Sequence, residues 1–143
     1  VEAWDKQLSV NLRGAFLISR KFIPNMKNMK KGILVFINSV AGNFGYPYSS
    51  AYVASKFGLR GFADSLRNEL RQDNIKVVSV HPGATDTPIW DKSDTDFPRS
   101  EMLSPQLVAD CVCYAVEAPG EAVVENLTVR REKSIYLLAF KIK

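Results

Sequence analysis

A run of five apolar residues from Ile33 to Ile37 limits the folds open to this chain more than any other sequence feature. The run has no polar alternation, so a strand formed here carries apolar side chains on both of its faces. Strands that are buried on both faces are typical of parallel sheets covered by helices. The run therefore predicts a parallel strand in an α/β domain.

Helical and strand-like patterns alternate along the rest of the chain. The predicted helices cover residues 3–29, 50–72 and 105–118, and the other predicted strands cover residues 75–80 and 123–129. Pro24 is expected to kink the first helix or to end its regular part, and Ser104 is expected to cap the third. This alternation predicts a doubly wound, Rossmann-type parallel sheet with helices on both faces, of which the chain supplies one half.

Two loops follow the first two predicted strands. Residues 38–50 are rich in Asn, Gly, Ser and Pro, and residues 84–103 form the longest stretch without a predicted element. Long loops are usually functional or mobile. Open α/β sheets bind ligands at the carboxyl ends of their strands, so we expect a ligand site at this end of the sheet.

Tyr52 and Lys56 stand four residues apart, on one face of the predicted helix 50–72. A tyrosine is a poor acid–base catalyst at its ordinary pKa of about 10, and a cation a few ångströms away favours the phenolate. Taken alone, the pair fits better a surface lysine that covers a half-buried tyrosine. Asn11 lies inside the first helix, where asparagine is not preferred, and it also fits a solvent-facing or kink-forming side chain.

Other polar groups lie where the same site needs them. Ser39 directly follows the first strand, and its hydroxyl can bond a substrate carbonyl, although a serine here alone fits a loop or a cap. Pro82 and Gly83 follow the next strand, and Gly allows a ligand to approach the backbone closely. The hydroxyls of Thr85 and Thr87 come next and can bond an amide or a phosphate. Taken alone, the Pro-Gly pair indicates only a turn.

Together these residues resemble the short-chain dehydrogenase/reductase family, over residues 1 to about 130. The resemblance is carried by Asn11, Ser39, the Tyr52–Lys56 motif and the segment from His81 to Thr87. It implies that Tyr52 is the general acid/base and that Lys56 lowers the pKa of Tyr52 and holds the nicotinamide ribose. It also implies that Ser39 polarises the substrate carbonyl and that Asn11 holds a water linking Lys56 to solvent.

The same resemblance implies a nicotinamide cofactor, NADP or NAD, with NADP preferred. The implied cofactor-binding residues are Tyr52, Lys56, Pro82, Gly83, Thr85 and Thr87. Thr85 is expected to act through its backbone and Thr87 through its hydroxyl, and the loop 88–103 is expected to form a substrate lid. An apolar, aromatic pocket is expected from Phe44, Tyr46, Tyr48, Ile89 and Trp90, although these side chains fit ordinary packing equally well.

The resemblance covers the C-terminal half of the family's fold. The Gly-rich turn that receives the cofactor pyrophosphate at a helix N-terminus has no counterpart here. We expect a partial domain over residues 1–130 and a C-terminal tail over 131–143 of unclear status. We also expect an exposed inner edge on the first strand. This polypeptide alone is then expected to bind no dinucleotide tightly and to have no turnover.

Two functions are compatible with these features. The first is an oxidoreductase that moves a hydride between NAD(P)H and a small apolar carbonyl or alcohol. The alternative is a non-catalytic truncated homologue that acts as a dimerisation or interaction module. The resemblance implies homo-oligomers through the helices 3–29 and 50–72 in either case.

Composition argues against other classes of function. The longest apolar runs have six residues, far short of the roughly 20 that a membrane span needs. The net charge of +4 is scattered, whereas nucleic-acid binding needs a basic stripe. His81 is the only histidine, which excludes a His-rich metal site. Cys111 and Cys113 lie on different sides of the predicted helix and fit small buried hydrophobes in a reducing, cytoplasmic environment.

Overall fold

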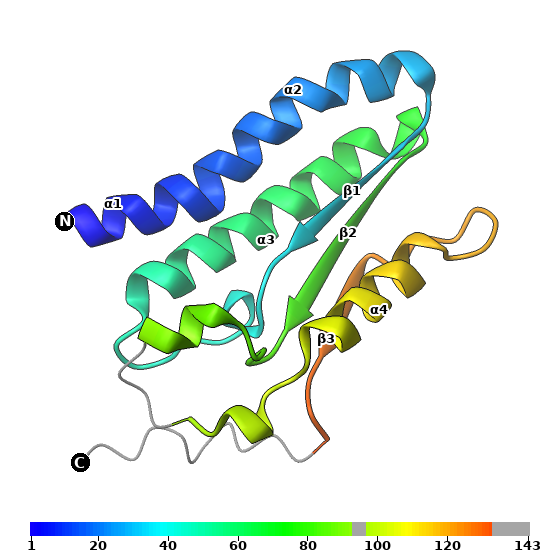
Figure 1. Cartoon of the computed structure of the whole chain (residues 1–143). Coiled ribbons are helices and arrows are strands. Elements are labelled where there is room, and N and C mark those ends of the chain that lie inside the picture. Colours follow the sequence, from blue (N-terminus) through cyan, green and yellow to red (C-terminus); the bar gives the residue numbers. More distant parts are fainter. Residues whose placement is uncertain (93–96, 133–143) are drawn as a thin grey trace.

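The computed structural model describes residues 1–92 and 97–132. Three strands form one parallel sheet in the order β1-β2-β3 (Figure 1). The strands are β1 (Gly32–Ile37), β2 (Ile75–Pro82) and β3 (Asn126–Val129). The α-helices are α1 (Glu2–Leu8), α2 (Gly14–Met29), α3 (Ser50–Leu70) and α4 (Pro105–Val116). Helices α2 and α3 cover one face of the sheet and α4 covers the other, which confirms the predicted α/β class.

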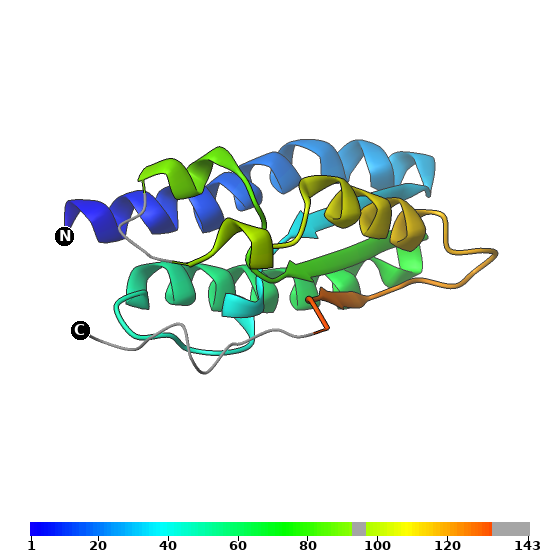
Figure 2. The same ribbon diagram turned by 60° about the horizontal axis from the view of Figure 1, so that its bottom comes forward.

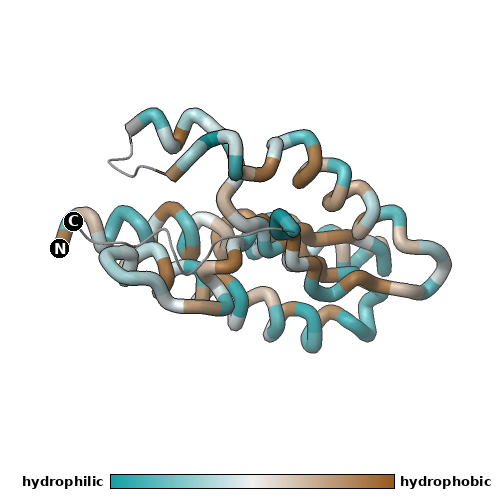
Figure 3. The backbone as a smooth tube through the Cα atoms, turned by 90° about the horizontal axis from the view of Figure 1, so that it is seen from below, coloured by the Kyte–Doolittle hydropathy of each residue, from teal (hydrophilic) through white to brown (hydrophobic). Residues whose placement is uncertain are grey.

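Two apolar clusters fill the space between the sheet and its helices. The first joins Phe36 of β1 and Val77 of β2 to Leu66 of α3. The second lies on the opposite face and joins Val80 of β2 to Ala115 of α4. Neighbouring residues of β2 therefore belong to different clusters, as is expected of a strand that is buried on both faces. Figure 3 shows the hydrophobic residues gathering where the strands run between the helix layers.

The apolar run that predicted a parallel strand forms β1, at the edge of the sheet. Phe36 is buried on the α3 side, and Val35 packs against the α4 cluster. Ile33 and Ile37 remain 37% and 51% exposed. Burial on both faces is therefore confirmed for the middle of the strand and is wrong for its ends. The reason is that no strand among the described residues pairs with its outer edge.

The predicted N-terminal helix is one helical rod with an internal irregularity. A π-helical turn over Ser9–Arg13 separates α1 from α2. Pro24 does not end the helix, which continues to Met29 and stops at Lys30 in the left-handed conformation (φ 49°). Ile23 and Met26 pack against the core on either side of Pro24, so tertiary contacts hold this segment helical.

The remaining elements follow the predicted order with shifted ends. A short 3-10 turn over Arg71–Asp73 extends α3, and the Oγ of Ser104 accepts from the backbone N–H of Leu107 (3.1 Å) as the predicted cap of α4. β3 begins three residues later than predicted, because Val123 and Val124 pack against the α4 cluster outside the sheet. Within the described part of residues 84–103 the structure has short 3-10 turns and an isolated β-bridge between Thr85 and Leu103, and residues 93–96 lie outside the described part.

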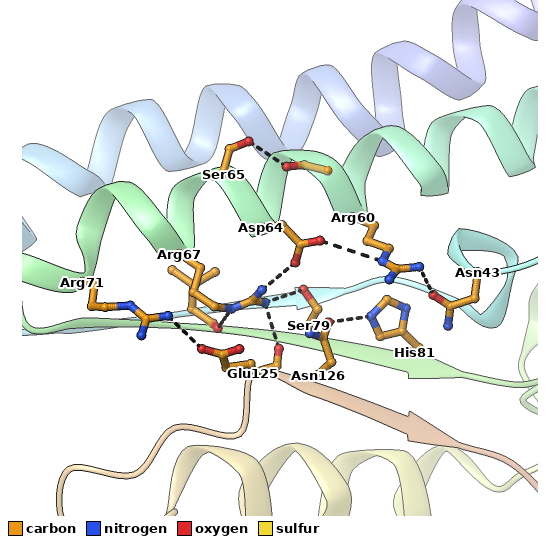
Figure 4. Close-up of polar contacts among 12 residues, drawn as sticks. Asn43, Arg60, Asp64, Ser65, Arg67, Arg71, Ser79, His81, Glu125 and Asn126 are labelled. Carbon is orange, nitrogen blue, oxygen red and sulfur yellow. Dashed lines mark hydrogen bonds and ion pairs between the residues drawn. The ribbon is translucent and has the colours of Figure 1, made fainter.

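The buried Arg67 of α3 ties three elements together (Figure 4). Its Nε donates to the Val77 carbonyl of β2 (3.0 Å), and its Nη2 donates to the Glu125 carbonyl next to β3 (2.9 Å). Its Nη1 bonds Asp64 one turn earlier on α3 (2.5 Å). These bonds fix the helix that carries Tyr52 and Lys56 against the strands.

Candidate active site

The loops that follow β1 and β2 meet at one end of the sheet (Figure 2). A cavity of about 490 Å³ opens there, at the carboxyl ends of the parallel strands. The predicted site residues that line it are Ser39, Tyr52, Pro82, Gly83, Thr85 and Thr87. Asn11 and Lys56 are not among the residues that line it. The structure therefore gathers the predicted site where open α/β sheets bind ligands.

Ser39 leaves β1 and caps the 3-10 turn Val40–Gly42. Its Oγ accepts from the backbone N–H of Ala41 at 3.1 Å, and its hydroxyl proton remains available for a substrate oxygen. Its carbonyl oxygen lies 3.2 Å from Nδ1 of the buried His81, which must act as the donor to a carbonyl. The capping and the substrate-binding interpretations of Ser39 are thus compatible.

Tyr52 and Lys56 lie on successive turns of α3, at the cavity end of the helix. The Lys56 Nζ is 5.8 Å from the centre of the Tyr52 ring, so the cation lies near the phenol as the spacing predicts. The same ammonium donates to the backbone carbonyl of Ile37 (3.1 Å). Burial lowers the pKa of Lys56 below its ordinary 10.5, because desolvation disfavours the charged form.

Asn11 lies in the π-helical turn, and its side chain reaches α3. Its Nδ2 donates to the Oγ of the fully buried Ser55 (3.0 Å) and to the Oε1 of Gln7 (3.0 Å). Ser55 in turn donates to the Tyr52 carbonyl (2.7 Å). A solvent-facing role for Asn11 is therefore wrong. π-Helical turns are frequent at functional sites, and here the turn anchors the helix segment between Tyr52 and Lys56.

The segment after β2 is held in place by backbone contacts. The N–H of Gly83 donates to the Val129 carbonyl of β3 (2.8 Å). Thr85 Oγ1 donates to the Gly83 carbonyl (3.0 Å), and the Thr85 carbonyl accepts from Trp90 Nε1 (2.8 Å). The hydroxyls of Thr85 and Thr87 thus lie on a fixed segment at the cavity.

The expected aromatic pocket is present in part. Tyr46, Ile89 and Trp90 line the cavity, and the Trp90 ring stacks on Phe97 with ring centres 6.2 Å apart. Phe44 and Tyr48 do not line it. Tyr48 is 88% exposed, and Phe44 packs under the Arg130 guanidinium, 4.9 Å from its ring centre.

Sequence reasoning missed four polar residues of the cavity: Asn38, Ser49, Glu101 and Arg131. Asn38 is 4% exposed, and neither its Oδ1 nor its Nδ2 has a hydrogen-bond partner in the described part of the chain. Glu101 and Arg131 also line the cavity, and Arg131 donates to the Ser100 carbonyl. Asn38 had a signal in the sequence, because it stands between a buried strand and Ser39. Glu101 and Arg131 had none.

His81 is a structural residue in this arrangement. Its Nε2 lies 3.2 Å from Oδ1 of Asn126, so the ring joins the Ser39 loop to β3 (Figure 4). Among residues 1–92 and 97–132, no three His, Cys, Asp or Glu side chains are grouped to hold a metal ion. In the same ranges, no helix has the length and hydropathy of a membrane span. Both cysteines are free, and Cys113 is exposed, so its predicted burial is wrong.

Comparison with known proteins connects this geometry to a family. The family model described as short chain dehydrogenase matches residues 1–97. Sepiapterin reductase of Chlorobaculum tepidum is 34% identical over 129 residues, covering 90% of this chain and 52% of that protein. The chain thus spans about half the length of the curated relatives that it matches.

Solved structures of dehydrogenases also resemble this chain over about half of their own length. Acetoin dehydrogenase YohF of Salmonella typhimurium superimposes with a TM-score of 0.77 and 29% identity, over 90% of this chain and 55% of the other. 4-Hydroxyisoleucine dehydrogenase complexed with NADH also superimposes with a TM-score of 0.77 and 29% identity, over 90% of this chain and 58% of the other.

Proposed function

The chain belongs to the short-chain dehydrogenase family, and from this premise we propose that it is the catalytic half of an oxidoreductase that moves a hydride between NAD(P)H and a carbonyl or alcohol. The observation that carries the proposal is the cavity that Ser39 and Tyr52 share, with the Lys56 ammonium 5.8 Å from the Tyr52 ring. A hydroxyl, a phenol and a cation in this arrangement suit acid–base chemistry on a carbonyl oxygen.

Each residue has one role in this proposal. Ser39 donates its hydroxyl proton to the substrate oxygen and fixes the carbonyl in the cavity. Tyr52 gives a proton to that oxygen in reduction and takes it back in oxidation. Lys56 stabilises the phenolate by its charge. Asn11 orients the α3 segment through Ser55, and it is suited to hold the water that returns protons to Lys56.

The cavity fits the nicotinamide end of a dinucleotide. Gly83 leaves the backbone open to a flat ring, and the backbone of Thr85 and the hydroxyl of Thr87 are suited to a carboxamide. The cofactor, NADP or NAD, supplies or accepts the hydride when bound. The relative complexed with NADH supports a nicotinamide cofactor. The described residues contain no Gly-rich turn for the pyrophosphate, so the chain alone should bind the dinucleotide weakly and have no turnover.

A chimera tests the proposal. It joins the part of the Chlorobaculum sepiapterin reductase that lies outside the matched segment to the 143-residue chain. We expect the chimera to oxidise NADPH or NADH with small apolar carbonyls, acetoin among them, and the chain alone to be inactive. Circular dichroism and cofactor binding establish that the chimera is folded. A folded, cofactor-binding chimera without turnover on any carbonyl would contradict the oxidoreductase, and steady reduction by the chain alone would contradict its status as a half.

We also propose that the chain forms homo-oligomers through α1, α2 and α3. Their outward sides carry half-exposed apolar residues, including Phe16, Ile18 and Phe57, and such faces are typical of interfaces. We expect Phe57→Asp to shift the chain to a smaller species in sedimentation velocity, whereas Tyr114→Asp on α4 leaves it unchanged. Equal sedimentation of both variants would contradict the interface, and with it the alternative function as a dimerisation module.

A cytoplasmic location completes the proposal. Both cysteines are free, with Cys113 exposed, which is compatible with a reducing compartment. A nicotinamide-dependent oxidoreductase of this kind needs neither a membrane nor a nucleic acid as its partner.

A further inference from the structure

Two charged side chains line the cavity, and the proposed proton transfer uses neither of them. Among the described residues of the lining, only Glu101 and Arg131 carry a charge. Ser39 and Tyr52 line the same cavity. Its volume of about 490 Å³ is in the range of small-molecule sites, so a ligand that fills it meets the two hydroxyl groups and both charges.

Backbone contacts fix the turn that carries Glu101. This residue ends the short 3-10 turn Arg99–Glu101. Two residues later, the N–H of Leu103 donates to the Ala84 carbonyl (2.8 Å), and the Leu103 carbonyl accepts from the N–H of Asp86 (2.8 Å). The turn is therefore bonded to the segment that follows β2, which forms one wall of the cavity.

Arg131 reaches the same turn from the end of β3. The N–H of Gly83 donates to the carbonyl of Val129, the last residue of β3 (2.8 Å), and so holds this strand end beside the segment after β2. The Arg131 guanidinium donates to the carbonyl of Ser100, the residue before Glu101. The two charges therefore lie near each other on backbone that is fixed from both sides.

The two charges nevertheless do not pair. Neither Glu101 nor Arg131 forms an ion pair with any described residue, whereas Arg99 in the same turn pairs with Asp86 (2.5 Å) and Asp91 (3.1 Å). No described residue donates a hydrogen bond to the Glu101 carboxylate. Arg131 uses one N–H on Ser100 and keeps further donors for a carboxylate.

We propose that the cavity selects a small zwitterion, an amino acid with a hydroxyl or carbonyl group on its β-carbon, whose carboxylate binds Arg131 and whose ammonium binds Glu101. The α-carbon of such a molecule carries both charges, and the neighbouring carbon carries the oxygen that Ser39 and Tyr52 need. A ligand with a carboxylate alone would face the like charge of Glu101, and one with an ammonium alone would face Arg131. The proposal rests on the proposed function and names its substrate class.

The reaction on this substrate is a balanced oxidation of an alcohol. The C–H and O–H bonds at the β-carbon break and a C=O bond forms. The hydride leaves with both electrons to the nicotinamide cofactor of the proposed function, and the hydroxyl proton leaves to Tyr52. The charges of Glu101 and Arg131 do not change in this step, so the two residues act on KM rather than on kcat. Neutral alcohols and carbonyls still reach Ser39 and Tyr52, at a higher KM.

Binding to the 143-residue chain tests the charges without any turnover. The probe is L-threonine, and three matched compounds remove its charges: 3-hydroxybutyrate lacks the ammonium, isopropanolamine lacks the carboxylate, and isopropanol lacks both. By nuclear magnetic resonance we expect threonine to shift the Arg131 Nε–H signal and the Glu101 carboxylate signal. The Nε–H of Arg130 is the internal control, since this side chain lies over Phe44 and not on the cavity.

Turnover by the chimera tests the same two residues as determinants of specificity. We expect threonine to have a KM about tenfold lower than each compound that lacks one charge. Arg131→Gln should raise the KM for threonine about tenfold without raising that for isopropanolamine, which has no carboxylate to lose. Glu101→Gln should raise the KM for threonine without raising that for 3-hydroxybutyrate.

Matched variants separate these effects from a change in net charge. Arg130→Gln and Glu121→Gln remove the same charges from residues that do not line the cavity, so both should keep the original KM for threonine. The kcat at saturating threonine should stay unchanged in all four variants.

The contradicting results are distinct. Unmoved Arg131 and Glu101 signals with threonine, or an equal KM for threonine and isopropanol, would overturn the zwitterion site. Equal rises of KM for threonine and isopropanolamine in Arg131→Gln would also overturn it, because they would show a structural role. A chimera that oxidises no alcohol would contradict the proposed function, whereas the binding of threonine to the chain decides the role of the two charges separately.

Discussion

Arg67 shows how one side chain sustains the site without touching it. It is 7% exposed and bonds α3, β2 and the residue before β3. Its removal takes the side-chain donor from the Val77 carbonyl, one of two donors from the Glu125 carbonyl and the nearer of two cations from Asp64. Loss of a buried charged partner is strongly destabilising, because the groups left behind are desolvated and unpaired.

We therefore expect Arg67→Met to lower the free energy of unfolding by about 3–5 kcal/mol. Arg60 is the matched control, since it lies two turns earlier on α3 and pairs with the same Asp64 from an exposed position. Arg60→Met should change the free energy by about 1 kcal/mol or less. Urea denaturation of both variants measures the difference. Equal losses of unfolding free energy would show that the hydrogen bonds of Arg67 do not hold α3 against the strands.

The burial of Lys56 makes the free energy of unfolding depend on pH. Its pKa is lowered by burial from 10.5, so the folded chain loses this proton at lower pH than the unfolded chain does. Between the two pKa values the unfolded state binds more protons, and stability rises with pH. The penalty for the buried charge is fully present below the folded pKa and disappears as the pH approaches 10.5.

The difference in unfolding free energy between the unchanged chain and Lys56→Met isolates this contribution. We expect it to move in favour of the unchanged chain as the pH rises from about 7 to about 10, because the neutral amine is cheaper to bury. Urea denaturation at several pH values measures it. A difference that stays constant with pH would mean that Lys56 is not desolvated in solution.

The residue types of the site could be predicted, and their contacts could not. The sequence pointed to Ser39, Tyr52 and Lys56 because proton transfer to a carbonyl calls for a hydroxyl, a phenol and a nearby cation, and these three residues stand at the expected spacing. The bonds of Lys56 to Ile37 and of Asn11 to Ser55 depend on long-range packing. Periodicity in one helix does not show which side chain on a distant helix it faces.

At the scale of elements, close packing between the N-terminal rod and α3 depends on a glycine. A Cβ on Gly58 would come within 2.8 Å of a methyl of Leu12, whereas a Cβ on Gly61 meets no atom within 4 Å. Both glycines lie inside α3, where alanine is the better helix former. Alanine substitutions at the two glycines therefore distinguish the effect of helix propensity from the effect of packing between helices.

We expect Gly61→Ala to raise the unfolding free energy by about 0.5–1 kcal/mol, because alanine loses less backbone entropy on folding. Gly58→Ala gains the same propensity but must displace Leu12, and overpacking costs about 1–3 kcal/mol. It should be less stable than Gly61→Ala in thermal unfolding. A Gly58→Ala chain as stable as Gly61→Ala would mean that the helices are not in contact at Leu12.

Helices and strands were predictable where local signals agree with packing. Ser104 followed by Pro105 begins α4 as expected. The π-helical turn at Ser9–Arg13 was not predictable, because five residues are too few to reveal a change of period. Pro24 does not end the helix, because core contacts on both sides of it outweigh the local break.

At the scale of the whole molecule, the described residues form a three-stranded parallel sheet with a cavity at the carboxyl ends of its strands. The cavity is lined by Ser39, Tyr52 and the segment after β2, and no strand of the described residues pairs with the outer edge of β1. The fold class could be predicted from the alternating elements, whereas the partial domain expected from the missing Gly-rich turn stays a prediction. The bond between the Lys56 ammonium and the Ile37 carbonyl could not be predicted, since the two residues are 19 positions apart in the sequence.

The central claim is that Tyr52 transfers the proton, and one comparison of rates tests it most directly. In the chimera, Tyr52→Phe removes only the phenol oxygen, and Tyr114→Phe makes the same change at an exposed position on α4. We predict that Tyr52→Phe lowers kcat by about 10²–10⁴-fold with cofactor binding retained, since general acid–base catalysis contributes this much. Tyr114→Phe should keep the original kcat. Equal turnover by the two variants would contradict the account.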